Sequence, residues 1–165
     1  KNMKVKSSVV NQGHDCPQIS MYTIEGALFF GVAKMFESSI MSTINHHPKT
    51  LVLRMSKVPY MDTTGESNLT SIVRHFRKQG GKIVLSGLQK QPEEVMKRTG
   101  LYNEIGREHI YEHTGDALNF ALTNLNKNKC KGCKHFAFKE CQSLSKVDIN
   151  EIKDVNSRFI DVGEA

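Results

Sequence analysis

Short apolar runs alternate along this chain with longer stretches in which apolar residues recur every three or four positions. The run from Leu51 to Met55 predicts a buried strand, and a loop follows it. Beyond the loop, four apolar residues have the i, i+3, i+4, i+7 spacing of a helix with one buried face: Leu69, Ile72, Val73 and Phe76. The pattern therefore predicts a strand–loop–helix unit in the middle of the chain.

The remaining pattern predicts further strands and helices on both sides of this unit. We expect strands at residues 19–24, 27–30, 83–88 and 110–111, and a helix at residues 32–44. Pro92 is expected to open another helix that ends before Gly100, and Thr114 is expected to cap a last one. Strands that alternate with helices predict an α/β fold, with a mixed sheet of about four to five strands and helices packed against it.

Composition divides the chain of 165 residues into three parts. Residues 1–17 are polar and weakly patterned, which is typical of a leader or linker. Residues 18–126 carry the α/β pattern, and residues 127–165 form a C-terminal tail that contains cysteine and lysine. No apolar run reaches the roughly 18 residues that a membrane span needs, so we expect the fragment itself to be soluble.

The basic character behind the formal charge of +6 is largely local to the first part of the tail. Five of its lysines lie close together: Lys127, Lys129, Lys131, Lys134 and Lys139. The core lacks the interleaved basic and aromatic pattern of RNA-binding sheets, so nucleic acid is not an expected partner. Four cysteines without a secretory signal indicate reduced thiols in a cytoplasmic setting.

The loop before the central helix reads Asp62, Thr63, Thr64, Gly65, and we treat these four residues as the candidate regulatory site. Free amides and the positive end of the dipole favour an anion at a helix start, such as a free or covalently attached phosphate. The alternative is a purely structural capping box, in which Thr63 and Glu66 bond each other's amides. For Asp62 alone, an Asx turn is expected rather than acid–base chemistry, and no nucleophile–base pair predicts an enzyme.

A second candidate site lies in the tail, where Cys130, Cys133 and His135 are followed by Cys141. Three thiolates and one imidazole are the ligand set of a tetrahedral structural zinc site. The alternative is a flexible tail whose reduced thiols are made prone to oxidation by the neighbouring lysines.

The residues from Val58 to Gly65 resemble the signature loop of STAS domains, and the order of elements from Ile19 to Leu125 fits that fold. Two further stretches, residues 24–30 and 53–55, are similar to the branch found as the cytoplasmic C-terminal domain of sulfate-permease (SulP) anion transporters. The other branch of the family consists of soluble anti-sigma-factor antagonists.

The resemblance implies a non-enzymatic regulatory and interaction domain of a SulP-type secondary transporter for sulfate-like anions. Such a domain lies on the cytoplasmic side of the inner membrane. The implied partners are the transmembrane domain of the same transporter, a second copy of the domain, and a protein or nucleotide ligand at the Asp62 loop.

The alternative implied by the resemblance is a soluble anti-sigma-factor antagonist switched by phosphorylation. Thr64 occupies the position of the serine that is phosphorylated in that branch. Glu66 stands where the antagonists often have leucine, and its carboxylate would repel a phosphate on Thr64.

Overall fold

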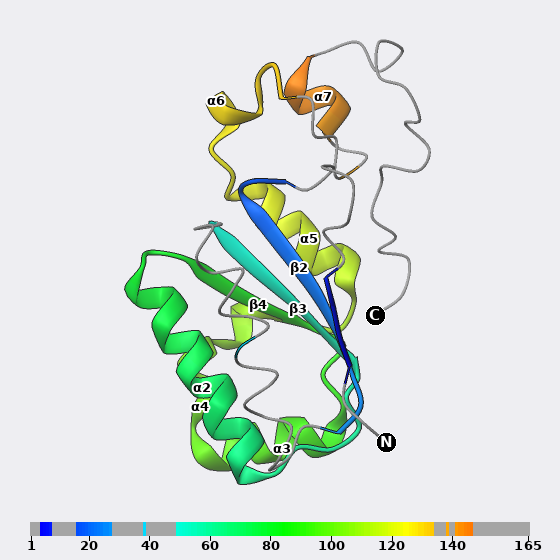
Figure 1. Cartoon of the computed structure of the whole chain (residues 1–165), viewed down its shortest axis with the longest axis vertical. Coiled ribbons are helices and arrows are strands. Elements are labelled where there is room, and N and C mark those ends of the chain that lie inside the picture. The colour runs from blue at the N-terminus through cyan, green and yellow to red at the C-terminus, as the bar shows by residue number, and fades with distance from the viewer. Residues whose placement is uncertain are drawn as a thin grey trace.

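The computed structural model describes residues 4–7, 16–27, 38, 49–133, 138 and 141–146. Within them the chain forms a five-stranded sheet with helices on both faces (Figure 1). The strands are β1 (Lys4–Ser7), β2 (Ile19–Glu25), β3 (Thr50–Lys57), β4 (Lys82–Ser86) and β5 (Ile110–Tyr111). The helices are α2 (Thr63–Lys78), α3 (Lys90–Thr99), α4 (Leu101–Ile105), the 3-10 turn η1 (Arg107–His109), α5 (Thr114–Thr123), α6 (Lys127–Cys130) and α7 (Cys141–Ser145).

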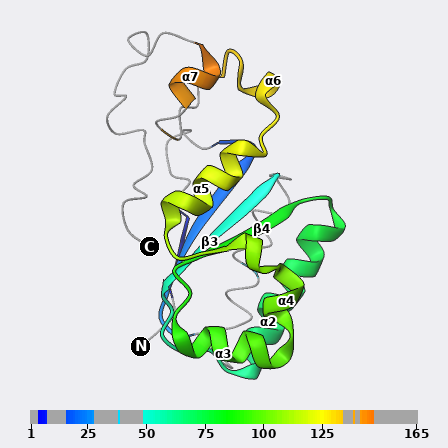
Figure 2. The same cartoon turned by 180° about the vertical axis from the view of Figure 1, so that it is seen from behind.

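The strands lie in the order β1-β2-β3-β4-β5, and β2 to β5 are parallel. The prediction of a mixed α/β sheet is therefore confirmed. Because parallel strands end at the same edge, the loops that follow β3, β4 and β5 gather at one end of the sheet. The tail helices α6 and α7 lie at the opposite end of the molecule (Figures 1 and 2).

The edge strand β1 was not predicted, because residues 4–7 were assigned to a leader. It pairs antiparallel with β2, with Lys4 opposite Glu25 and Val5 opposite Ile24. Residues 4–7 contain only one apolar side chain, Val5, so neither alternation nor a buried run marks them as a strand. Backbone pairing with β2 at the edge of the sheet forms this strand without a side-chain pattern that would predict it.

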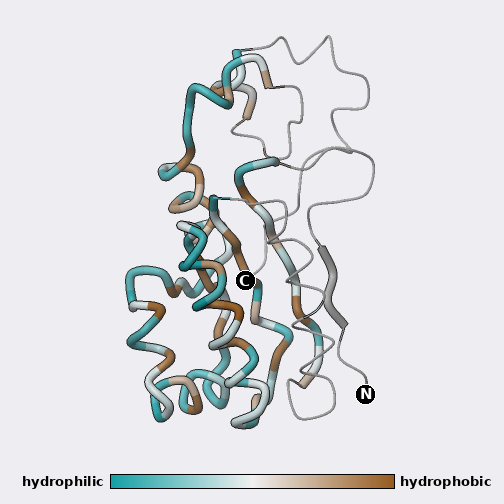
Figure 3. Tube along the Cα trace, turned by 60° about the vertical axis from the view of Figure 1, so that its left-hand side comes forward, coloured by the Kyte–Doolittle hydropathy of each residue, from teal (hydrophilic) through white to brown (hydrophobic). Residues whose placement is uncertain are grey.

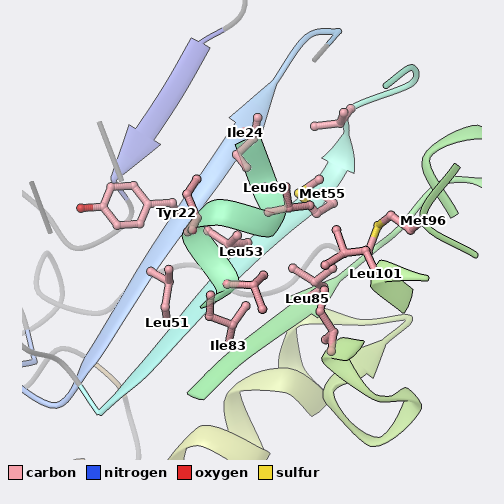
Figure 4. Close-up of a cluster of buried hydrophobic side chains, with 14 of the residues drawn as sticks. Tyr22, Ile24, Leu51, Leu53, Met55, Leu69, Ile83, Leu85, Met96 and Leu101 are labelled. Carbon is pink, nitrogen blue, oxygen red and sulfur yellow. The ribbon is translucent and has the colours of Figure 1, made fainter. Parts of the chain in front are cut away.

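One face of the sheet packs against α2, α3 and α4 (Figure 4). The buried residues of this cluster are Tyr22, Ile24, Leu51, Leu53, Met55, Val58, Met61, Leu69, Ile72, Val73, Phe76, Ile83, Leu85, Met96, Leu101 and Ile105. All four apolar positions that predicted α2 are among them, so that prediction is confirmed. Burial of this stripe fixes which side of α2 faces the sheet.

The opposite face is covered by α5, which crosses the sheet on the side turned toward the viewer in Figure 2. Val52 and Val84 point to this face, whereas their neighbours Leu51 and Ile83 point to the other. Such continuous apolar runs are typical of parallel strands buried on both faces. Figure 3 shows the same division, with hydrophobic strands inside and hydrophilic segments along the outer helices.

Three helix boundaries differ from the prediction. Helix α3 begins at Lys90 rather than at Pro92, because proline is tolerated throughout a first turn whose amides lack intrahelical acceptors. Gly100 ends it with φ +91°, as expected, but α4 starts again directly at Leu101. Thr114 does not cap α5: the cap position is His113, and the buried Thr114 hydroxyl lies 2.9 Å from the Ser86 hydroxyl.

The predicted strand at residues 27–30 and the predicted helix at residues 32–44 lie almost wholly outside the described residues, although Ser38 is helical. Among the helices that the structure does describe, none combines the length and the apolar character that crossing a bilayer requires.

Candidate functional site

The candidate regulatory loop leaves the carboxyl end of β3 and enters α2. Burial alternates sharply along it, because Val58 and Met61 are fully buried while Tyr60 keeps 48% of its surface exposed. The two buried side chains anchor the loop in the same cluster that holds α2 against the sheet. The exposed side chain of Tyr60 therefore lies between two buried anchor residues, two positions before Asp62.

Two glutamines from the next crossover connection hold this loop in place. The Met61 amide donates to Gln91 Oε1 at 2.7 Å, and Gln91 Nε2 donates to the Met61 carbonyl at 2.9 Å. Gln89 Nε2 donates to the Ser56 carbonyl at 2.6 Å, at the end of β3. The sequence analysis missed both glutamines, since no local pattern links them to a loop 30 residues away.

Asp62 is the N-cap of α2. Its Oδ1 accepts a hydrogen bond from the Gly65 amide at 2.8 Å, and its carbonyl accepts one from the Glu66 amide at 2.9 Å. The capping box predicted between Thr63 and Glu66 is therefore wrong by one position, because Thr63 is already the first helical residue. Asp62 has a local structural role in this loop.

The Glu66 side chain also differs from the capping-box prediction. It is 8% exposed, and its Oε1 accepts from the Thr70 hydroxyl at 2.7 Å, one turn further along α2. The carboxylate therefore points along the helix instead of back to the Thr63 amide. This bond to Thr70 stabilises a buried charge at the first turn, where the helix dipole already favours it.

The first two amides of α2 belong to Thr63 and Thr64. The amides of Thr63 and Thr64 make no hydrogen bond to any other described residue. Thr63 is exposed, Thr64 is half-buried, and Gly65 is buried. The structure thus brings the four predicted site residues together at the start of α2, where Asp62 already satisfies the amide of Gly65.

The far end of α2 is fixed to α4 by two arginines. Arg74 donates to both carboxylate oxygens of Glu104, at 2.8 and 3.2 Å, and Arg77 donates to the carbonyls of Glu104 and Ile105. The hydrogen bond from Arg74 holds the pKa of Glu104 below its usual value. These contacts satisfy carbonyls at the end of α4 that have no partner within that helix.

An open groove of about 670 Å³ lies next to the loop, beyond the carboxyl ends of β3, β4 and β5. Its lining is mixed in charge: Ser56, Gly87, Leu88, Gln89, Glu93, Tyr102, Arg107, Ile110, Tyr111, Glu112 and His113. None of the four predicted site residues lines it. Its link to the regulatory loop is Gln89, which lines the groove and also bonds the Ser56 carbonyl.

The second candidate site is partly described. Cys130 ends α6, Cys141 begins α7, and Cys133 lies between them, whereas His135 lies outside the described residues. Within the described ranges, no three His, Cys, Asp or Glu side chains are placed so that they could hold a metal ion. The structure adds a cysteine that the spacing could not indicate, because Cys16 lines the same pocket as these three.

A family model described as "STAS domain" matches residues 10–117, which is more than half of the chain. The chain belongs to the STAS domain family. This STAS domain is 45% identical over 97 residues to a Bacillus subtilis (strain 168) protein named "Putative sulfate transporter YvdB". The match covers 59% of the chain but only 18% of that relative, so the chain spans less than a fifth of its length.

Two solved structures from sulfate transporters show the same fold as this STAS domain. One is a sulfate transporter family protein from Wolinella succinogenes, with 31% identity, a TM-score of 0.59 and coverage of 64% of this chain and 86% of that one. The other is the SulP transporter STAS domain from Vibrio cholerae, with 33% identity, a TM-score of 0.55 and coverage of 64% and 82%. The anti-sigma factor antagonist SpoIIAA, at 12% identity and a TM-score of 0.54, shares the fold alone.

Proposed function

We propose that this STAS domain is the regulatory and interaction domain of a SulP-type secondary anion transporter, and that it is not an enzyme. The sequence identity to sulfate transporters carries this proposal, because it is 31–45%, whereas the identity to SpoIIAA is 12%. By this proposal the domain lies on the cytoplasmic side of the membrane, next to the transmembrane domain of the same protein. A second copy of the domain is a further proposed partner.

The proposed contact surface is the exposed part of the β3–α2 connection. Pro59, Tyr60 and Thr63 are exposed, and the buried residues Val58 and Met61 alternate with them. Tyrosine offers a large apolar area with a polar end and few rotatable bonds, which suits a contact surface. The bonds from Gln91 to Met61 keep this surface in one conformation, so binding would cost little ordering of the loop.

The same loop is proposed to take an anionic ligand, either from a protein or from a nucleotide. The amides of Thr63 and Thr64 lie at the start of a 16-residue helix and bond no other described residue, which supports this proposal. Regulation would then follow if a bound anion changed the contact that Tyr60 makes with the transporter.

A soluble antagonist switched by phosphorylation at Thr64 is the alternative function. The position of Thr64 in the first turn of α2 supports it, because a phosphate there would meet the positive end of the dipole. The buried carboxylate of Glu66 lies in the same turn and opposes it. Intact-mass analysis after incubation with the cognate kinase tests this function, and a phosphate on any residue other than Thr64 would contradict it.

Transport by the complete gene product tests the transporter proposal. The gene, extended upstream of Lys1, is expected to encode a series of membrane spans. Its product is expected to restore uptake of labelled sulfate in a host strain that has no sulfate uptake of its own. Tyr60→Ala should lower uptake at an unchanged amount of protein in the membrane, whereas Asn119→Ala, an exposed position on α5, should not. A gene product without membrane spans, or equal uptake by both variants and wild type, would reject the proposal.

A further inference from the structure

All four cysteines of the chain line one small pocket, although they come from distant parts of the sequence. Cys16 precedes β2, Cys130 ends α6, Cys133 follows it, and Cys141 begins α7. The rest of the wall is largely apolar, with Leu122 and Leu125 from the end of α5 and Phe138 and Leu144 from the tail. Four thiols that line one pocket are the residue types of a complete ligand set for a metal that prefers sulfur.

Gln18 holds the Cys16 segment against the start of the tail. Its Nε2 donates to the Asn126 carbonyl at 3.1 Å, and its Oε1 accepts from the Asn126 amide at 2.8 Å. The same Nε2 lies 3.6 Å from Cys130 Sγ and donates to it. This side chain is 6% exposed, so the contact between residue 18 and residues 126–130 is a fixed part of the fold. Donors of this kind around sulfur are typical of the outer shell of metal sites.

The segment from Cys130 to Cys133 forms a tight turn. Cys133 donates its amide to the Cys130 carbonyl at 3.0 Å, and Gly132 has φ +74°. With Lys131 at φ −62° and ψ 123°, these angles are those of a type II turn, which needs glycine at its third position. The turn brings the two cysteines of the Cys-x-x-Cys motif close together.

Helix α7 is fastened to this turn by two hydrogen bonds. The Gly132 amide donates to the Ser145 carbonyl at 2.9 Å, and the Ser145 hydroxyl donates to the Cys133 carbonyl at 2.5 Å. Ser145 is 3% exposed. These bonds hold α7, and with it Cys141, beside the Cys-x-x-Cys turn.

We propose that Cys16, Cys130, Cys133 and Cys141 form a four-thiolate structural site for Zn²⁺, which joins the tail to the amino end of β2. Each thiol gives up its proton on binding, so four protons leave and the complex carries a net charge of −2. The exposed Lys129 and Lys131 lie next to two of the ligands and offset this charge. Among the described residues these side chains are not placed to hold an ion, so the proposal requires the four thiols to change position when Zn²⁺ binds.

This ligand set differs from the one predicted from the sequence, because Cys16 replaces His135. Zinc content separates the two sets. The 165-residue chain is purified without chelator or metal-affinity resin, and its zinc content is measured by inductively coupled plasma mass spectrometry. We expect about one zinc ion per chain, its loss in Cys16→Ser and in Cys141→Ser, and no change in His135→Ala.

Cobalt substitution provides a second readout, because the absorption spectrum of bound Co²⁺ reports which atoms coordinate the metal. Wild type and His135→Ala loaded with Co²⁺ should share one spectrum, with intense sulfur-to-cobalt bands and the visible bands of a tetrahedral site. Circular dichroism checks that each serine variant keeps its secondary structure. Protein with four thiols titratable by a disulfide reagent and no bound zinc would overturn the proposal, as would iron in place of zinc, full zinc in Cys16→Ser, or loss of zinc in His135→Ala.

Discussion

Gln91 bonds both backbone groups of Met61, accepting from its amide at 2.7 Å and donating to its carbonyl at 2.9 Å. A single side-chain amide here satisfies both main-chain polar groups of a loop residue. Since Met61 is fully buried, its backbone groups have little access to water and depend on this partner. Gln91, which helps to hold the Asp62 loop in position, therefore belongs to α3 and not to the flanking elements β3 and α2.

Removing this side chain should loosen the loop and destabilise the domain. Gln91→Ala leaves the Met61 amide and carbonyl without their partner, and we expect a loss of about 1–3 kcal/mol in the free energy of unfolding. Urea unfolding followed by circular dichroism measures it. Gln79→Ala, at an exposed position on the other end of α2, is the control and should change stability little. An equal loss in both variants would contradict a specific role for Gln91.

The position of the α2 cap can be tested by comparing neighbouring residues. Asp62→Ala removes the acceptor of the Gly65 amide and should cost about 1 kcal/mol of unfolding free energy. Thr63→Ala should cost less, because Thr63 is exposed and already helical. The reverse order in the measured stabilities would support the Thr63–Glu66 capping box and reject Asp62 as the cap.

Ser86 and Thr114 form a buried pair of hydroxyls, 2.9 Å apart, between β4 and the start of α5. Thr114→Val keeps the shape but leaves the Ser86 hydroxyl without this partner, so we expect a loss of about 1–3 kcal/mol. The double variant Ser86→Ala/Thr114→Val should be more stable than the sum of the single losses predicts. Strictly additive losses in a thermal or urea unfolding cycle would show that the two hydroxyls do not depend on each other.

The Arg74–Glu104 pair predicts a specific dependence of stability on pH. The hydrogen bond from Arg74 lowers the pKa of Glu104 from its ordinary value of 4.5. A lowered pKa means that the stabilisation is fully present above pH 4.5 and is lost as the pH falls through the folded value. Glu104→Gln should therefore flatten the fall in stability below pH 4.5, with little change in the slope above it.

Salt provides the control for this prediction. Both side chains are partly exposed, so 1 M sodium chloride should screen the pair, with a Debye length of about 3 Å. The difference between wild type and Glu104→Gln should shrink accordingly. A pH profile identical in the two proteins at low salt would contradict the role assigned to Arg74.

Local features of the fold could be read from the sequence because their signals are local. The spacing of Leu69, Ile72, Val73 and Phe76 determines which face of α2 is buried, and Gly100 marks the end of α3 because its φ is +91°. The residues from Val58 to Gly65 and the order of elements indicated the STAS family, which the comparisons then showed. The cap of α2 was misplaced by one residue, since Asp62 and Thr63 are both good N-caps and only the backbone angles distinguish them.

The sequence by itself determined the α/β class, the buried stripes of the helices and the family, because each depends on residue types at short, regular spacing. Only the tertiary structure decided that residues 4–7 extend the sheet, that Gln91 holds Met61, and that Cys16 meets Cys130, Cys133 and Cys141. These relationships join residues from 15 to more than 100 positions apart, and they arise from how the antiparallel edge strand, the parallel strands and their crossover helices are arranged around the sheet. No periodic pattern along the chain predicts such long-range contacts.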